Sequence, residues 1–279
     1  MARKPLQLDE IGYWSEIKLE IIRKYAAAYS TILAKKSFIT GHVYIDAFAG
    51  AGKHISKGTG ETVTGSPVNA LRIEPPFTEL HLIDLDGSRV DELRRLTASD
   101  PRVRVYEGDC NTVLTRDVFP RCQWSDYRRA LCLLDPYKLN VEWQVLQMAG
   151  RMKTIEVFYN FMIMDANMNV FMRNPSKVTP EQAARMDAVW GDDSWRTAAY
   201  VKTNDLFGEI EEKATNEQIA EAFRARLNQV AGFSYVPNPI PMRNSRGAVV
   251  YYLYFASPNK TGAKIVSEIF DKYGHKGAA

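Results

Sequence analysis

Two glycines and two carboxylates stand where the chain could bind an adenosine-containing ligand. Gly50 and Gly52 follow a short β-rich run in the segment Asp46–Gly52, which reads Asp-Ala-Phe-Ala-Gly-Ala-Gly. Glycine lets a turn be tight and lets a ligand lie against bare backbone. Asp84 and Asp109 each follow another predicted strand, and ligands of open α/β sheets bind beyond the carboxyl ends of the strands. Asp84 could accept hydrogen bonds from both ribose hydroxyls, and Asp109 could hold an adenine amine.

A dinucleotide is the obvious competing ligand. Its fingerprint needs a third glycine three residues after the second, and here that place is Ile55. The next predicted helix begins only at about Ser66, so a pyrophosphate would lack a helix N-terminus close by. S-adenosylmethionine has no phosphates and is therefore the predicted cofactor. The residues assigned to its site are Asp46, Phe48, Gly50, Gly52, Asp84, Asp109 and Cys110.

The triplet Asp135-Pro136-Tyr137 follows the fourth predicted strand and could take part in methyl transfer. Asp135 could orient a substrate amine, Pro136 makes the next peptide unit rigid, and Tyr137 could stack on the substrate. A structural loop with Tyr137 packed at the sheet edge is the alternative. Asn160 ends the fifth strand and either faces the pocket or packs at the edge of the core. Transfer to an amine needs positioning more than a strong base.

Alternating strands and helices must place these residues. Apolar residues at spacings of three and four predict a helix over residues 13–36. Lys18 on this helix either closes over the cofactor or packs, and packing is favoured. Ser66 and Ser88 are expected to cap the two helices that follow, and residues 53–65 are interpreted as a loop. Five strands are predicted at residues 43–48, 80–84, 103–107, 130–135 and 155–163.

The second half of the chain completes the predicted sheet after an interruption. Residues 165–205 break the strand–helix rhythm and are interpreted as a helical insertion, with a helix over residues 180–190. Residues 217–230 and 261–273 are expected to be helical, and strands at 233–239 and 248–255 are expected to form a hairpin at one edge. The fold class is thus α/β and Rossmann-like, with a mostly parallel seven-stranded sheet. The predicted division is an N-terminal helical extension at 1–40, a core at 41–164 and 206–279, and the insertion at 165–205.

Bulk composition limits the classes of function. The chain has 279 residues, a net charge of +3 and 46% hydrophobic residues, which is ordinary for a globular protein. No apolar run approaches the about 20 residues that span a bilayer, and the N-terminus lacks the apolar stretch of a signal peptide. We therefore expect a cytoplasmic protein without a membrane partner. Three cysteines without a CxxC pair and four scattered histidines predict structural thiols and no metal site. Arginines between residues 102 and 129 are dense enough to suggest RNA or DNA as a partner, with a solvated surface equally compatible.

Together these motifs resemble those of class I methyltransferases. The first motif, Asp46–Gly52, has the form found in the group that methylates exocyclic amines of nucleic-acid bases. In the later motif that ends in an aromatic residue, that group has two prolines, whereas this chain has only Pro136 before Tyr137. More closely, the chain resembles the three-Cys-motif partner protein family, TcmP. The matching segments are Trp14–Glu20, Tyr44–Gly50, Gly65–Pro67, Leu133–Tyr137, Asn160–Phe161 and Gly191–Trp195. This resemblance implies a partner protein that carries a three-cysteine motif and is similar to radical-SAM enzymes.

The sequence therefore predicts a methyltransferase that uses S-adenosylmethionine, with an amine of a nucleic-acid base as the substrate. One alternative is a methyltransferase that acts on a protein or a small molecule. The other is a non-catalytic accessory subunit of the three-Cys-motif partner. The intact glycines and carboxylates argue against the accessory subunit for cofactor binding but not for turnover.

Overall fold

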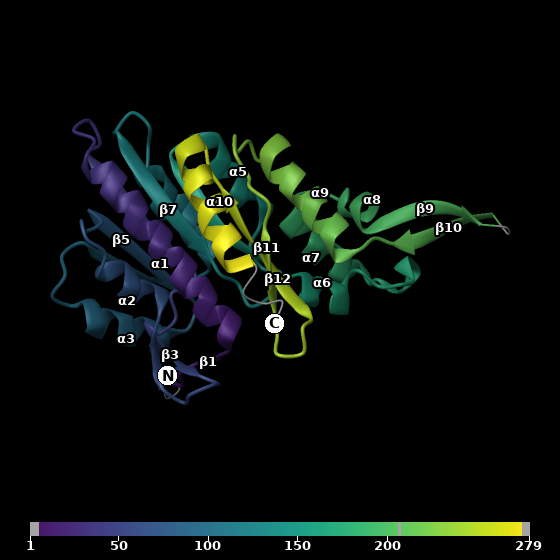
Figure 1. Cartoon of the computed structure of the whole chain (residues 1–279), viewed down its shortest axis with the longest axis horizontal. Helices are drawn as coiled ribbons and strands as arrows, with labels where there is room; N and C mark the ends of the chain where they lie inside the picture. The colour runs from purple at the N-terminus through teal and green to yellow at the C-terminus, as the bar shows by residue number, and fades with distance from the viewer. Residues whose placement is uncertain (1–5, 206–207, 275–279) are drawn as a thin grey trace.

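A seven-stranded sheet forms the centre of the computed structural model, which describes residues 6–205 and 208–274 (Figure 1). Its strand order is β11-β12-β8-β7-β2-β5-β6. The strands from β8 to β6 are parallel, and β12 is antiparallel to both of its neighbours. The mostly parallel seven-stranded α/β fold predicted from the sequence is confirmed. The strands are β2 (Gly41–Asp46), β5 (Glu79–Asp84), β6 (Val103–Glu107), β7 (Arg128–Leu134), β8 (Ile155–Phe161), β11 (Ile240–Arg243) and β12 (Val249–Ala256).

Helices cover both faces of this sheet, because side chains along a strand point alternately to the two faces. In β7, Ala130 and Cys132 belong to one core, and Leu131 and Leu133 belong to the other. The helices α1, α2 and α10 pack on the second face, and Figure 1 shows α1 and α10 side by side. The helices of the core are α1 (Tyr13–Ala34), α2 (Ser66–Leu71), α3 (Gly87–Thr97), α4 (Cys110–Val113), α5 (Trp143–Met152), α9 (Asn216–Gln229) and α10 (Lys260–Gly274).

The stretch interpreted as a loop, residues 53–65, contains two strands, so that prediction was wrong. β3 (Lys53–Ser56) and β4 (Thr62–Thr64) form an antiparallel pair. A third strand, β1 (Glu10–Ile11), pairs with β3 in parallel. Short β-branched runs suit such strands, but the strand that completes the sheet comes from a distant part of the chain. Local composition could not reveal that partner.

Both predicted helix caps were wrong by one or two residues. Gly65 precedes α2, and Ser66 is already its first helical residue. At α3 the cap is Asp86, whose side chain accepts hydrogen bonds from the backbone N–H groups of Ser88 and Arg89 at 2.8 and 3.2 Å. Aspartate is as good a helix cap as serine, so the nearby serine gave a misleading signal.

The late edge hairpin is confirmed, but its first strand lies further along the chain than predicted. Within residues 233–239 the structure has only an isolated bridge between Tyr235 and Ser257, and β11 begins at Ile240. Pro237 and Pro239 lack the N–H group that a strand ladder needs. These prolines explain why regular pairing starts only after them.

The segment after β8 contains the helix expected over residues 180–190, together with two short helices and a hairpin that were not individually predicted. β9 (Tyr200–Asp205) and β10 (Gly208–Lys213) pair antiparallel and extend away from the sheet in Figure 1. The division predicted between residues 205 and 206 falls between these two strands. The helices of the segment are α6 (Ile163–Asn169), α7 (Pro180–Trp190) and α8 (Trp195–Ala199).

Candidate active site

Gly50 and Asp84 meet where β2 and β5 end. The φ angle of Gly50 is 61°, in the left-handed region that favours glycine. Its backbone N donates a hydrogen bond to Oδ2 of Asp84 at 2.8 Å, and Oδ1 of Asp84 accepts one from the backbone N of Asp86 at 2.8 Å. Each carboxylate oxygen has a second lone pair. Asp84 can therefore hold the glycine turn and accept a further hydrogen bond from a ligand.

The two glycines of this turn have different surroundings. A Cβ atom on Gly50 would come no closer than 4.0 Å to its nearest neighbour, the ring of His54. A Cβ atom on Gly52, whose φ is 79°, would lie 3.1 Å from Val68 and 3.3 Å from Leu96. Gly50 therefore leaves open space beside the backbone, whereas Gly52 allows the turn to pack closely against the helices.

Asp46, at the end of β2, is a fully buried carboxyl group. Its Oδ1 accepts a hydrogen bond from the backbone N of Phe48 at 3.2 Å, and its Oδ2 meets no well-aligned donor among the residues that the structure describes, although the Ser66 hydroxyl lies close enough to lower the pKa of the carboxyl group. Burial raises the pKa of Asp46 to about 7. The Phe48 N–H and the Ser66 hydroxyl satisfy this buried carboxyl group only in part, so Asp46 retains capacity to accept from a bound molecule.

Asp109 and Cys110 follow β6 and differ in exposure. The Asp109 side chain is exposed and caps α4, with Oδ1 accepting from the backbone N of Thr112 at 3.1 Å. Cys110 is buried, and burial raises the pKa of its thiol to about 12. The thiol therefore stays protonated at neutral pH. The backbone N of Gly108 donates to the carbonyl oxygen of Asp84 at 3.1 Å, which holds this turn next to the turn after β5.

A cavity of about 190 Å³ also lies at the carboxyl ends of the parallel strands. It brings together the four residues predicted to be catalytic, namely Asp135, Pro136, Tyr137 and Asn160, and Phe48 from the predicted cofactor set. The other predicted cofactor residues lie at or just after the ends of β2, β5 and β6 but are not among the residues that line this cavity. Residues that the sequence did not assign to a site also line it, among them Lys18, His54, Ser66, Met162 and Tyr251.

Asp135 is held from two sides inside this cavity. Lys18 on α1 forms an ion pair with Oδ2, and Nδ2 of Asn160 donates a hydrogen bond to Oδ1. Asn160 is 1% exposed, and its Oδ1 has no hydrogen-bond partner within the described ranges. Because its Nδ2 is bound to the carboxylate, the orientation of the amide is fixed. Asn160, in the wall of the cavity, therefore has a buried acceptor without a partner beside the carboxylate of Asp135.

Lys18 keeps its positive charge in this setting. Burial alone would lower its pKa, but the charge of Asp135 and their hydrogen bond outweigh burial, so the pKa is raised. The sequence carried a signal for this residue, because Lys18 lies on the apolar stripe of α1 together with Ile22, Tyr25 and Tyr29. A lysine on a buried helix face needs a partner. Lys18 is packed in the protein, as the sequence favoured, and the structure adds its ion pair with Asp135, which the sequence did not predict.

Tyr137 is not packed at the sheet edge, because 62% of the residue is exposed. Its hydroxyl donates to Oδ2 of Asp9 at 3.0 Å, and Oδ1 of Asp9 accepts from Arg89 at 2.7 Å. Asp9 immediately precedes β1. The N-terminal segment thus connects the loop after β7 with the start of α3.

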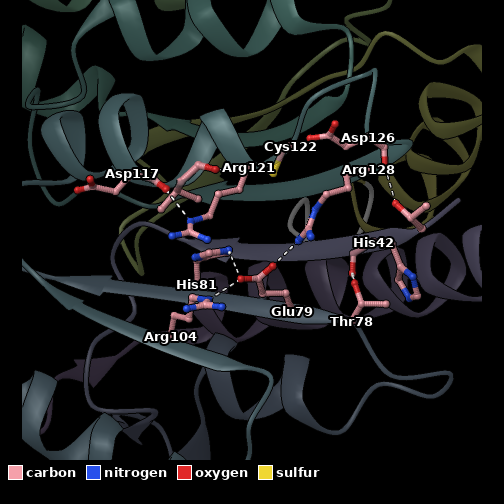
Figure 2. Close-up of polar contacts among 12 residues, drawn as sticks. His42, Thr78, Glu79, His81, Arg104, Asp117, Arg121, Cys122, Asp126 and Arg128 are labelled. Atoms are coloured by element: carbon pink, nitrogen blue, oxygen red, sulfur yellow. Dashed lines mark hydrogen bonds and ion pairs between the residues drawn. The ribbon is translucent and has the colours of Figure 1, made fainter.

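The arginines that suggested a nucleic-acid partner are largely paired within the protein. Figure 2 shows Arg104, Arg128 and His81 around Glu79. The Nε atom of Arg104 is 2.6 Å from Oε1 of Glu79, and Arg128 pairs with Oε2. These residues lie at the starts of β5, β6 and β7, whereas Asp135 follows the end of β7. The cluster therefore lies at the amino-terminal ends of the parallel strands, whereas the cavity lies at their carboxyl ends.

The described residues contain neither a cluster of metal ligands nor a helix that could span a membrane. No group of three or more His, Cys, Asp or Glu side chains is placed to hold a metal ion within residues 6–205 and 208–274. Over the same ranges no helix has the length and apolar character needed to cross a membrane. The three cysteines are buried and free.

Comparison with known proteins gives a fold and no family. No family model matches the chain, and no curated protein matches it significantly. Among solved structures it is similar to protein LPL1258 of Legionella pneumophila, described as DUF519, with a TM-score of 0.52, 12% identity and coverage of 94% of this chain and 91% of that one.

Two further solved structures are more distant. An O-methyltransferase family protein from Burkholderia thailandensis has a TM-score of 0.33 and 14% identity, over 86% of this chain and 58% of that one. The O-methyltransferase NcsB1 of neocarzinostatin biosynthesis, in complex with S-adenosylmethionine and 2-hydroxy-5-methyl naphthoic acid, has a TM-score of 0.33 and 12% identity, over 88% and 61%. What the comparisons establish is that the chain shares its α/β fold with the Legionella protein.

Proposed function

We propose that this protein is an S-adenosylmethionine-dependent methyltransferase whose substrate is an amine on a planar ring, as in a nucleic-acid base. The observation that carries the proposal is the unused Oδ1 acceptor of Asn160 beside the carboxylate of Asp135. An amine has N–H groups to donate, and two neighbouring acceptors would hold its nitrogen in one orientation. These acceptors lie where α/β sheets bind their ligands.

The ends of β2, β5 and β6 fit the cofactor. Gly50 leaves open space beside the backbone, and Asp84 retains lone pairs for ribose hydroxyls. Asp46 has a buried oxygen that no well-aligned donor among the described residues meets, and Asp109 would accept from the adenine amine. When bound, S-adenosylmethionine supplies a methyl group that is already activated for transfer to a nucleophile.

The chain's own residues then position the substrate. Lys18 stays protonated, so it is not a general base, and its charge balances that of Asp135. Asp135 and Asn160 would accept the hydrogens of the amine, which leaves the nitrogen lone pair free. The exposed ring of Tyr137 is available to stack on a planar substrate. Preorganised contacts of this kind lower the barrier because no reorganisation is needed during transfer.

Calorimetry with S-adenosylmethionine tests the cofactor site. The wild type should bind saturably, and Asp84→Ala should bind at least about tenfold more weakly, since a charge-assisted hydrogen bond contributes about 1.5–3 kcal/mol. Asp86→Ala is the matched control, because Asp86 is the neighbouring carboxylate and caps α3. Equal affinity in Asp84→Ala and wild type would remove Asp84 from the site.

Labelled methyl transfer tests the substrate class. Bulk RNA, bulk DNA, protein and small aromatic amines are offered separately, with and without the three-Cys-motif protein that the sequence resemblance implies as a partner. Label in RNA or DNA, lost in Asp135→Ala, would support the proposal. Label only in protein or a small molecule would contradict the nucleic-acid substrate. A wild type that binds the cofactor and labels none of these would favour the accessory-subunit alternative.

A further inference from the structure

A second cavity lies at the starts of β7 and β8, at the opposite ends of these strands from Asp135. Its volume is about 630 Å³, within the range of small-molecule sites. Arg129 and Glu156 line it at the starts of β7 and β8. Asp135, in contrast, follows the end of β7, and Asn160 lies near the end of β8. Its side walls come from α1 and α10, which Figure 1 shows next to each other. This cavity is therefore separate from the candidate active site.

The walls of this second cavity are mainly aliphatic and aromatic. Ile32 and Leu33 contribute from α1, and Ile265 contributes from α10. At the rim, Phe38 is 56% exposed and Trp124 is 59% exposed. Exposed aromatic rings at the mouth of an apolar cavity offer faces on which a planar ring can stack.

Two residues that line this cavity have a buried hydroxyl group without a hydrogen-bond partner among the described residues. These groups are Oη of Tyr29, whose residue is 6% exposed, and Oγ1 of Thr154, whose residue is 1% exposed. Neither atom meets a donor or acceptor in the described part of the chain. An unmet buried hydroxyl costs free energy, and a polar ligand in the cavity would remove that cost.

Among the charged residues that line the cavity, cations outnumber carboxylates. Lys36, Arg129, Lys153 and Lys260 line it, and Glu156 is the only carboxylate among the described residues that line it. Glu156 is already bound, since it accepts hydrogen bonds from Tyr25 and from Ser257, the latter at 2.9 Å.

The cations are less completely satisfied than this carboxylate. Lys153 donates to the carbonyl oxygen of Gly232. Arg129 donates to the carbonyl oxygen of Arg128 at 2.7 Å and stacks on Trp124 with its guanidinium carbon 3.9 Å from the ring centroid, but it pairs with no carboxylate among the described residues. The N-terminal turn of α10, from Lys260 to Gly262, also lines the cavity, and a helix N-terminus favours an anion.

We propose that this cavity binds a small organic anion that combines a planar ring with a carboxylate or phosphate group. The ring lies between the apolar walls and the rim aromatics, and the acidic group meets Arg129 and the α10 N-terminus. Tyr29 and Thr154 supply hydrogen bonds to polar atoms of the ring. This proposal does not depend on the methyltransferase activity, because the two cavities lie at opposite ends of the same parallel strands.

Fluorescence of 8-anilinonaphthalene-1-sulfonate, an aromatic anion, provides a direct probe. The wild type should bind it saturably, and Arg129→Gln should bind at least about tenfold more weakly, as expected from the loss of one charge-assisted contact. Arg121→Gln is the matched control, because Arg121 is exposed near the same edge and does not line the cavity. Ile32→Trp places an indole into the cavity from a half-buried helix position and should abolish binding even if Arg129→Gln is poorly folded.

Competition with the fluorescent probe then tests whether the acidic group of a ligand is recognised and which acidic group is preferred. Guanosine 5′-monophosphate and indole-3-carboxylate are compared with guanosine and indole, which have the same rings without the acid. The proposal expects one or both anions to displace the probe at least about tenfold better than the neutral molecule, for the same charge-assisted contact. Displacement by the phosphate alone or by the carboxylate alone identifies the acidic group.

Three results would overturn the proposal. They are no saturable probe binding to the wild type, equal displacement by the neutral molecules, and unchanged probe binding in folded Ile32→Trp. Calorimetry with S-adenosylmethionine on the same variants shows whether the cofactor site at the carboxyl ends of the strands is intact. Its outcome bears on the active site and leaves the inference about this cavity unaffected.

Discussion

Lys18 and Asp135 form an ion pair across 117 positions of sequence, between the first long helix and the end of β7. Lys18 has 8% of its side chain exposed and Asp135 has 26%. The pair makes α1 part of the candidate site and fixes the carboxylate that the substrate would meet. Because a buried charge without a partner is costly, each residue constrains the other.

Asp135→Ala should separate substrate positioning from cofactor binding. Affinity for S-adenosylmethionine should stay near the wild-type value, because Asp84 and Asp109 would bind the adenosine. Methyl transfer should fall by about a hundredfold or more, the usual cost of losing one positioned polar group at a reacting centre. Calorimetry and labelled transfer measure the two quantities. Tyr137→Phe, which keeps the ring and removes the hydroxyl bound to Asp9, is the control and should retain transfer. Wild-type transfer rates in Asp135→Ala would mean that Asp135 is only a turn residue.

Lys18→Met should destabilise the fold because it leaves Asp135 without its cation. We expect a loss of about 1–3 kcal/mol in the free energy of unfolding, below the value for a fully buried pair because Asp135 is partly exposed. Urea denaturation measures it. In the double variant Lys18→Met/Asp135→Leu no charge remains unpaired, so the loss should be smaller than the sum of the two single losses. Strictly additive losses would show that the two residues do not interact energetically.

Glu156→Gln should change how stability depends on pH. Burial raises the pKa of Glu156 from 4.5 to about 7. Between these values the folded protein keeps a proton that the unfolded chain has lost, so stability falls as the pH rises through this window. Glutamine removes that loss, and at pH 8 the variant should be more stable than wild type by up to about 3 kcal/mol.

At pH 4.5 the wild type and Glu156→Gln should differ little, because the glutamate is then protonated in the folded state. Urea denaturation at both pH values supplies the comparison. The pKa of Asp46 is also raised by burial to about 7. Its contribution is common to both proteins and cancels in the difference. The same stability difference at pH 4.5 and pH 8 would contradict the raised pKa of Glu156.

Gly262→Ala should destabilise the protein although alanine is the better helix former. A Cβ atom at this position would lie 2.5 Å from Oη of Tyr25 and 2.8 Å from Oε1 of Glu156. Overpacking of this kind costs about 1–3 kcal/mol, more than the gain in helix propensity. Gly274→Ala, on the same helix with nothing within 4 Å of the added atom, is the control. Thermal unfolding should show a lower midpoint for Gly262→Ala only, and an unchanged midpoint would mean that the contact relaxes without cost.

The strands and their order of appearance could be predicted because their signals are local. Residues 130–134 form an unbroken apolar run that ends at Asp135, as expected of a parallel strand buried on both faces. The turn at Gly50 was visible for the same reason. From strand ends alone it followed that Asp135 and Asn160 share one edge of the sheet, and the structure places both in one cavity. The resemblance to the three-Cys-motif partner family and the nucleic-acid substrate stay predictions.

Only the tertiary structure decided which distant residues meet. β1 pairs with β3 and Asp9 contacts Tyr137, although no local pattern near Asp9 indicates either contact. The arginines at the starts of the strands pair with Glu79, so their density in the sequence was no measure of free positive charge. Periodicity fixes which face of a helix is buried, but the partner of a buried lysine depends on how the helix is placed on the sheet. That placement results from packing over the whole core, which is why the sequence determined the strands and the tertiary structure decided the ion pair between Lys18 and Asp135.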